Sequence, residues 1–387
     1  EEGYFVVGGQ FWVECGPHGE LINILGILAV VVVWIGINTV AAGDYDALDI
    51  ALLYVQITGM VSSYGMKWHK NVDYVNTVLS IANFDVDFVA PMCLGAWTPV
   101  HGFYTQLILP FIFSLAQLLV ILFKQSSSLI GFGTTRKSLR ELVNDASSTV
   151  MHHGLSFSII VYHTLCLKCF QVFRCNDYPD GKSYMVFAPE VECWDATHKG
   201  MLAVASIYIP TVILGVPVFM FWVVHRAMKT DTLHTADVME RYSFFFSRYD
   251  TEYKWWEVMI MFRRLCIALV SIIIDTSMLQ GAITIIVLMG LLTAHTSTRP
   301  FVSEKIDNLE IFTLCGSIFY ALAGMLFYPS ITAAAQGRIC VGDNTPSACD
   351  GEVALKRIIG VILLVWFGGT LLLAFLVAGQ RIDQIQS

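Results

Sequence analysis

Charged side chains are scarce in this 387-residue sequence. Aspartate, glutamate, lysine and arginine make up 14% of it, whereas an ordinary soluble domain is roughly a quarter charged. The net charge of −8 does not suggest a nucleic-acid partner, which would need a basic surface. The sequence also lacks a Walker loop, a dinucleotide-binding fingerprint, an HExxH motif and a paired CxxC zinc set. Since no Ser/His/Asp or Cys/His set can be assigned either, we expect no enzymatic activity, no cofactor and no bound metal.

Hydrophobic residues are abundant instead, at 56% of the sequence, and they gather in runs of about 20 residues that can cross a bilayer. Because lipid cannot satisfy exposed backbone groups, such spans must be helical. We therefore predict an all-α fold, a polytopic membrane helical bundle of about nine transmembrane helices in contact with membrane lipid. The expected spans are Leu21–Val40, Ile50–Met66, Phe103–Phe123, Leu155–Phe173, Met201–Val224, a segment ending near Asp275, Met278–Ala294, Ile311–Tyr328 and Ile358–Gly379.

One further segment, Lys67–Gly95, mixes apolar and acidic residues, and we expect it to be a helix on the outer surface or a re-entrant segment. It contains Asp85 and Asp87, a pair of carboxylates that can attract cations to the mouth of a pore. The alternative is a solvated or helix-capping pair. A second acidic stretch, "NDYPDG" at 176–181, is rich in oxygen ligands but lacks the full calcium-loop pattern, so we interpret it as a turn.

The distribution of basic residues indicates the sidedness of the chain. If the N-terminus lies outside, the loops at 124–153, 225–254 and 298–306 face the cytoplasm and hold most of the lysine and arginine found between spans. Cytoplasmic loops are enriched in these residues. We therefore predict an outside N-terminus and a cytoplasmic C-terminus.

Cysteine positions agree with this topology, which places six cysteines outside and none in the inside loops. An even number of outer cysteines is typical of a disulfide framework in an oxidising compartment. Two pairs would each close one outer loop, and the two remaining cysteines would form a third pair. The alternative is that the cysteines are free thiols. The resulting candidates are Cys175 with Cys193, Cys340 with Cys349, and Cys15 with Cys93.

Three charged residues interrupt the sixth span: Glu257, Arg263 and Arg264. Glu257 and Arg264 share a helix face but lie about 10.5 Å apart along the axis, so each needs another partner. Asp307, expected to cap the eighth span with Glu310 three residues on, enters the membrane from the same side. One interpretation is a charged latch, or voltage-sensitive gate, between the arginines and these acids. The interpretation we favour is a tilted helix whose arginines reach lipid phosphates or the acidic turn. We expect an acid within hydrogen-bonding reach of at least one arginine.

Several segments follow one another in a specific order across most of Leu52 to Leu314. They are "LLYVQITGMVSSYGMKW", "NFDVDFVAPMCLG", "FQVFRCNDYPDGKSYMVFAPEVECWDATHKG", "GVPVFMFWVV", "YDTEYKWWEVMIMFRRL" and "RPFVSEKIDNLEIFTL". In this order the chain resembles the multi-pass membrane module at the C-terminal end of large cysteine-rich surface proteins of protists and algae. That module is described as TRP-like or polycystin-like.

Together with the spans, the resemblance implies that residues 1–20 end an extracellular cysteine-rich region, 21–379 form the transmembrane module and 380–387 form a cytoplasmic tail. It implies placement in the plasma membrane or ciliary membrane. Two functions remain open: a cation channel or channel-like subunit, and a non-conducting membrane anchor or receptor base for an adhesive or filamentous extracellular assembly. The expected protein partner is such an assembly or the chain's own upstream ectodomain, and an oligomer is left open.

Overall fold

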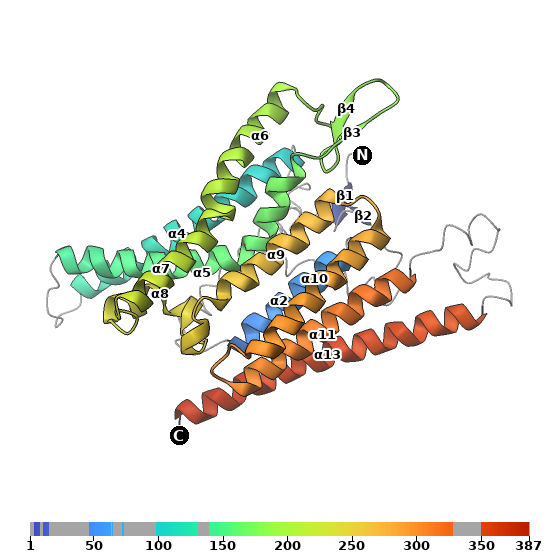
Figure 1. The fold of residues 1–387 in the computed structure, drawn as a ribbon. Helices are drawn as coiled ribbons and strands as arrows, with labels where there is room; N and C mark the ends of the chain where they lie inside the picture. Colours follow the sequence, from blue (N-terminus) through green and yellow to red (C-terminus); the bar gives the residue numbers. More distant parts are fainter. Residues whose placement is uncertain are drawn as a thin grey trace. The chain divides into compact units, whose positions relative to one another are not determined.

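A computed structural model describes the backbone of residues 4–7, 11–14, 46–62, 64, 72, 98–130, 139–327 and 350–386. There the chain is mostly helical, which confirms the predicted all-α class, and two short antiparallel hairpins are added (Figure 1). The chain divides into two compact units, one of residues 96–265 and one of residues 1–95 with 266–387. We call them the middle unit and the terminal unit.

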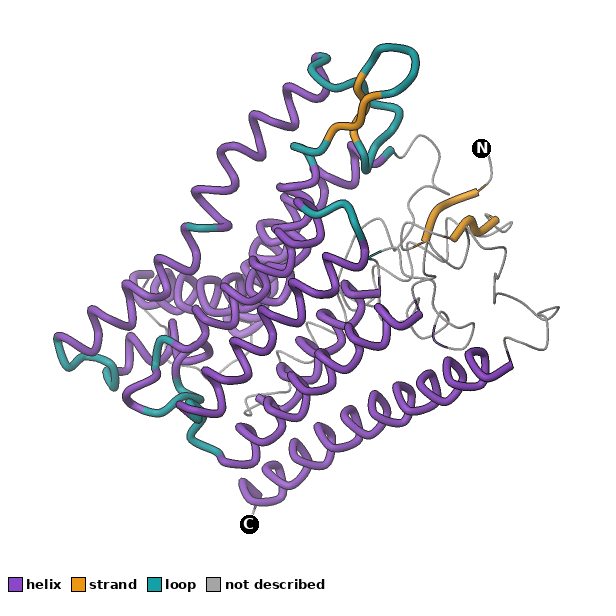
Figure 2. The backbone as a smooth tube through the Cα atoms, turned by 45° about the vertical axis from the view of Figure 1, so that its right-hand side comes forward, coloured by secondary structure: helices purple, strands orange, loops and turns teal. Residues whose placement is uncertain are grey.

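Helix α5 organises the middle unit, because it contacts α4, α6, η3 and α8. Phe113 of α4 and Phe157 of α5 stack with ring centroids 4.2 Å apart. Gly154 permits the close approach, since a Cβ there would lie 2.5 Å from Ser114 Oγ. Figure 2 shows the long helices and the loop with two strands that follows α5. The elements are α4 (Pro99–Ile130), α5 (Leu139–Gln171), β3 (Cys175–Asp177), β4 (Ser183–Met185), α6 (Ala196–Tyr208), the π-helix η3 (Ile209–Ile213), α7 (Gly215–Lys229), α8 (Ala236–Phe246), the 3-10 helix η4 (Thr251–Tyr253) and the first half of α9 (Trp256–Ile273).

Helix α11 organises the terminal unit and contacts α2, α10 and α13. Trp366 of α13 stacks on Phe312 of α11, with ring centroids 4.5 Å apart and the planes 5° from parallel. Gly316, one turn further along α11, makes room for this indole. The elements are β1 (Tyr4–Val7), β2 (Phe11–Glu14), α2 (Asp46–Ser62), the second half of α9, α10 (Ser277–Thr298), α11 (Glu304–Phe327) and α13 (Asp350–Gln386).

Replacing Gly316 with alanine will destabilise the terminal unit. An added Cβ would lie 2.5 Å from Trp366 Nε1 and 3.1 Å from Tyr54 Cε2, and the indole cannot move away without losing its stack on Phe312. Overpacking of this kind costs about 1–3 kcal/mol, which outweighs the gain of up to about 1 kcal/mol for alanine over glycine in a helix. Equilibrium unfolding in detergent measures the change.

The matched control is Gly368→Ala in α13, where an added Cβ meets no atom within 4 Å. This variant keeps the helix-propensity gain without the clash, so it should be neutral or slightly stabilising. If the Gly316→Ala variant is as stable as the Gly368→Ala variant, α11 and α13 do not approach each other as closely as described.

Six described helical segments are long and apolar enough to cross a membrane. They fall at six of the expected spans, but a total of about nine is not confirmed. Helix α9, at the sixth expected span, is not among them because its 18 residues include three charges. Helix α2 has 17 residues; the expected span 21–40 and most of 67–95 lie outside the described residues. The six segments are Pro99–Val120, Ser147–Gln171, Ala196–Lys229, Ser277–Thr298, Glu304–Leu326 and Arg357–Ala378.

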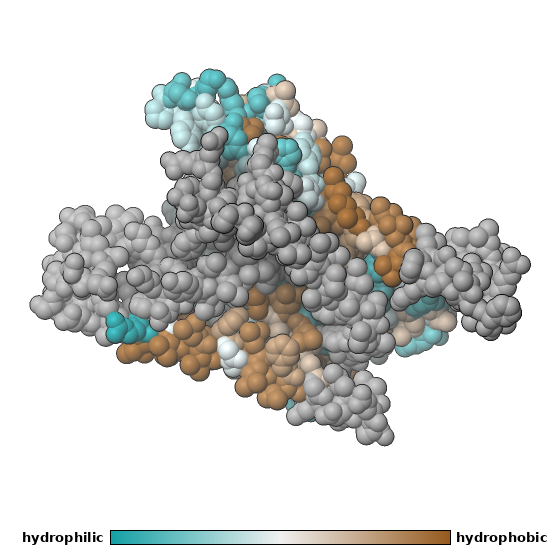
Figure 3. Space-filling model, turned by 180° about the vertical axis from the view of Figure 1, so that it is seen from behind, coloured by the Kyte–Doolittle hydropathy of each residue, from teal (hydrophilic) through white to brown (hydrophobic). Residues whose placement is uncertain are grey.

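Large hydrophobic side chains lie exposed along these helices, which is expected where lipid is the solvent. Along α6, η3 and α7, Ile207, Val218 and Trp222 are each more than half exposed. In Figure 3 this stretch is hydrophobic, and the β3–β4 hairpin beside it is hydrophilic.

Candidate functional site

A buried ion pair marks the turn that leads from α8 into α9. Glu257 Oε2 accepts hydrogen bonds from Arg248 Nη2 at 3.0 Å and from the Tyr249 hydroxyl at 2.7 Å. The Arg248 guanidinium also lies over the Tyr249 ring, 5.6 Å from its centroid. Glu257 is 3% exposed and Tyr249 is fully buried. We call these three residues the Glu257 cluster, and its bonds fix the path by which the chain enters α9.

Arg263 and Arg264 lie deeper in α9 and are buried, with 3% and 6% of their surface exposed. Arg264 Nη1 donates a hydrogen bond to the backbone carbonyl of Ile159 in α5. The interpretation in which these arginines reach lipid phosphates is therefore wrong, because both side chains are enclosed by protein. Charges buried within a span are costly and usually functional.

The acids expected to pair with those arginines lie in the terminal unit, where Asp307 has other contacts. Its Oδ1 lies 3.2 Å from His295 Nε2 and accepts the Phe301 backbone N–H at 3.2 Å. The prediction that Asp307 caps its helix is wrong, because α11 already begins at Glu304 and Asp307 stands inside its first turn. Glu310 is buried, with 2% exposed. The latch would join residues of two different units and stays a prediction.

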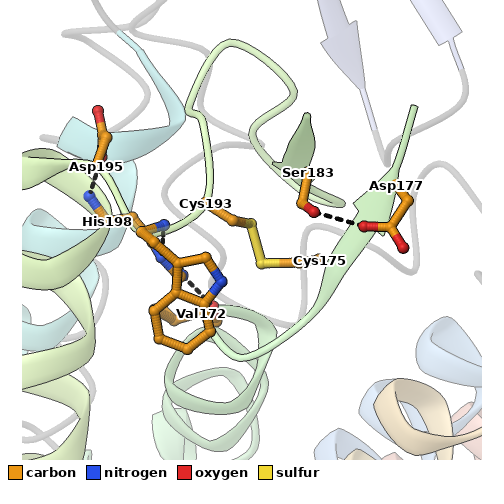
Figure 4. The surroundings of a disulfide bond; sticks show 8 residues. Val172, Cys175, Asp177, Ser183, Cys193, Asp195 and His198 are labelled. Atoms are coloured by element: carbon orange, nitrogen blue, oxygen red, sulfur yellow. Dashed lines mark hydrogen bonds between the residues drawn. A yellow bond between two sulfur atoms is a disulfide. The ribbon is translucent and has the colours of Figure 1, made fainter. Parts of the chain in front are cut away.

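The loop between α5 and α6 is closed by the disulfide Cys175–Cys193, as predicted (Figure 4). Strands β3 and β4 pair within it, with Cys175 opposite Met185. We call residues 172–195 the disulfide loop. Outside the described residues lie the other candidate cysteines Cys15, Cys93, Cys340 and Cys349, together with the carboxylates Asp85 and Asp87.

The stretch "NDYPDG" forms the tight turn of this hairpin. Gly181 has φ of 81°, in the left-handed region, and Asp180 accepts the Lys182 backbone N–H at 3.0 Å and the Tyr184 hydroxyl at 3.0 Å. The backbone donor lowers the pKa of Asp180, and the hydrogen bond to Glu192 raises the pKa of Lys182. The carboxylate oxygens of Asp180 are therefore engaged in holding the turn.

His198 locks the end of the disulfide loop to α5. Its Nδ1 accepts the Trp194 backbone N–H at 2.8 Å, so its Nε2 carries the proton and donates to the Val172 carbonyl at 3.0 Å (Figure 4). His198, Cys175 and Cys193 are close enough to hold a metal ion. However, the disulfide removes both thiolates and both ring nitrogens are already bonded, so the three residues serve as a structural clamp.

The spanning segment Ala196–Lys229 of the middle unit is interrupted by the π-helix η3, which has Pro210 near its start. The Tyr162 hydroxyl of α5 donates to the Ile213 carbonyl at 2.7 Å and so holds the π-helix to α5. π-Helical turns inside α-helices are frequent at functional sites.

Most of the partners that complete these clusters were not among the predicted site residues. Arg248 and Tyr249 lie in a loop that was predicted to face the cytoplasm, and no role was predicted for His295. A local signal existed for Arg248 and Tyr249, because they stand just before a helix that begins with tryptophans and a glutamate. No such signal existed for His295, which meets Asp307 only because α10 and α11 fold back on each other.

The structure combines helices with apolar surfaces, ionisable groups buried between them and a disulfide in a connecting loop. These features define a polytopic membrane protein. A family model described as "Transient receptor potential (TRP) ion channel" matches residues 98–338, so the chain belongs to this family. The TRP-like part of the predicted resemblance is thereby confirmed. No significant match was found among curated proteins or among solved structures.

Proposed function

We propose that the chain is the membrane module of a cation-channel subunit carried by a large cell-surface protein. The observation that supports this most is the family match, which spans both units from residue 98 to residue 338. The module itself is of the TRP channel type, a class of channels and not of enzymes. Ion conduction, cation preference and the surface protein are parts of the proposal.

In this proposal the disulfide loop lies on the extracellular side, because a disulfide persists in an oxidising compartment. The turn at 225–254, with the Glu257 cluster beside it, then faces the cytoplasm together with the turn between α10 and α11. In this orientation the N-terminus lies outside. The proposed location of the module is the plasma membrane or the ciliary membrane. Asp85 and Asp87 are the proposed cation-attracting pair at the outer mouth.

The proposed gate uses the buried arginines of α9. Arg263 and Arg264 stand where α9 passes from the middle unit to the terminal unit, whose boundary falls after Leu265. A carboxylate such as Asp307 or Glu310 in reach of them would tie the two units in one state. Moving a charge through the membrane field is worth about 2.3 kcal/mol per 100 mV, so this latch would make opening depend on voltage.

Recording from purified full-length chain in planar bilayers tests the proposal. We expect single-channel currents whose reversal potential in a KCl gradient follows the potassium potential, which identifies cation passage. Protein-free bilayers are the control for leakage. Asp85→Asn with Asp87→Asn should reduce cation selectivity while currents persist.

Absence of conductance under voltage, membrane stretch and calcium would contradict the channel. The alternative function, a non-conducting anchor or receptor base for an extracellular assembly, would then take its place. Cross-linking of intact cells that captures an extracellular assembly through the disulfide loop would support that outcome.

A further inference from the structure

A pocket lies between the last two turns of α7 and the chain that leads into α9. Its volume is about 420 Å³, within the range of roughly 300–1,000 Å³ typical of small-molecule sites. We call it the α7 pocket. It is lined by Phe221, Val224, His225, Met228, Glu252 and Trp255.

The walls of the α7 pocket follow directly from helical spacing. The four residues from α7 are at positions i, i+3, i+4 and i+7, so they form one face of the helix. The rings of Phe221 and His225 stack on this face, with centroids 5.9 Å apart and planes 10° from parallel. Glu252 of η4 and Trp255, just before α9, face them from the neighbouring segment.

The chemistry of the lining favours a ligand with an apolar body and a positive group. Among the described residues that line the pocket, Glu252 is the acidic one, and it is exposed. A carboxylate beside an aromatic ring is a favourable environment for an ammonium group, which is attracted to both. Phe221, Val224 and Met228 offer apolar surface to the rest of the ligand.

The place of the pocket in the spanning segment narrows the ligand class further. The segment Ala196–Lys229 is apolar enough to cross a membrane, and the pocket faces its final turns. Arg226 and Lys229 are the basic residues of that last turn. This end of a span lies at the level of lipid headgroups, where phosphates meet basic side chains.

We propose that the α7 pocket binds a phospholipid with an ammonium headgroup, such as phosphatidylcholine. The ammonium lies between Glu252 and Trp255, the acyl chains lie on Phe221 and Val224, and the phosphate faces the basic end of α7. The proposal rests on the membrane placement of α7 and does not depend on ion conduction.

Native mass spectrometry of the full-length chain in detergent, titrated with phosphatidylcholine or with phosphatidylglycerol, tests this site. We expect phosphatidylcholine to bind the wild-type chain more tightly. Glu252→Gln should weaken that binding about tenfold, equivalent to about 1.4 kcal/mol. It should leave phosphatidylglycerol unchanged. The matched control is Glu190→Gln, an exposed acid in the disulfide loop, which should bind both lipids as the wild type does.

Trp255→Leu provides a second test, because it keeps an apolar wall and removes the aromatic face. This variant should also weaken the binding of phosphatidylcholine and not that of phosphatidylglycerol. It provides the test of the site if Glu252→Gln fails to fold. Equal binding of the two lipids by the wild type, or phosphatidylcholine binding that survives both substitutions, would overturn the proposal and identify only general lipid contact.

Discussion

Replacing Glu257 with alanine will lower the free energy of unfolding by about 3–5 kcal/mol, the cost of removing one partner from a buried ion pair. The loss is large because Arg248 is only 11% exposed on its side chain and would keep its charge without this carboxylate. The Tyr249 hydroxyl, fully buried, would lose its 2.7 Å acceptor as well. Equilibrium unfolding in mixed micelles of mild detergent and SDS measures the change.

A surface pair in the same unit provides the control for this prediction. Asp237 pairs with Arg241 at 2.9 Å along α8, but its side chain is 65% exposed, so Asp237→Ala should have a far smaller effect. If Glu257→Ala costs no more than Asp237→Ala, the ion pair does not hold the entry to α9.

A double variant separates the cost of leaving the Arg248 charge without this carboxylate from the contribution of the pair as a whole. Arg248→Met with Glu257→Leu removes both charges and keeps apolar volume. Replacing a whole buried pair in this way is often close to neutral. We therefore expect the double variant to recover most of the stability lost in Glu257→Ala. A double variant as unstable as the single one would mean that the cluster stabilises the turn by more than charge pairing.

Opening the disulfide loop will produce the second large effect. Cys175 and Cys193 are separated by 18 positions, and a bridge over a loop of this length contributes about 3 kcal/mol in the chain-entropy account. Cys175→Ser with Cys193→Ser should therefore destabilise the loop and speed tryptic cleavage after Lys182. Limited proteolysis followed by mass spectrometry measures the rate. Cys315→Ser, which changes a free thiol in α11, is the control and should leave the loop intact.

The bridge itself can be checked in the unaltered chain. Trypsin cuts after Arg174, Lys182 and Lys199, so the two cysteines fall on separate peptides that stay joined until a reductant is added. Both peptides alkylated without prior reduction would contradict the disulfide and weaken the outer placement of the loop.

The spanning helices and the disulfide were predictable because their causes are local. Hydrophobicity adds up along consecutive residues, so the lipid environment of a run such as Met278–Ala294 can be predicted before any contact is known. The Cys175–Cys193 bridge closes one loop between two neighbouring spans, so sequence order alone brings the two cysteines near each other. The turn between α10 and α11 has a local cause as well, because Pro300 cannot continue a helix and α10 ends at Thr298.

The partners of the buried charges were decided by tertiary structure. Sequence alone determined that Glu257, Arg263 and Arg264 needed partners, because a charge within a span is costly. It could not choose the partners, since Arg264 meets the Ile159 carbonyl across 105 positions and Asp307 meets His295 only after α10 and α11 fold back. The tendency of a segment to enter the membrane is a sum over residues that are neighbours in the chain. A hydrogen bond between helices depends instead on where the two helices approach each other, and only the packed fold sets that distance.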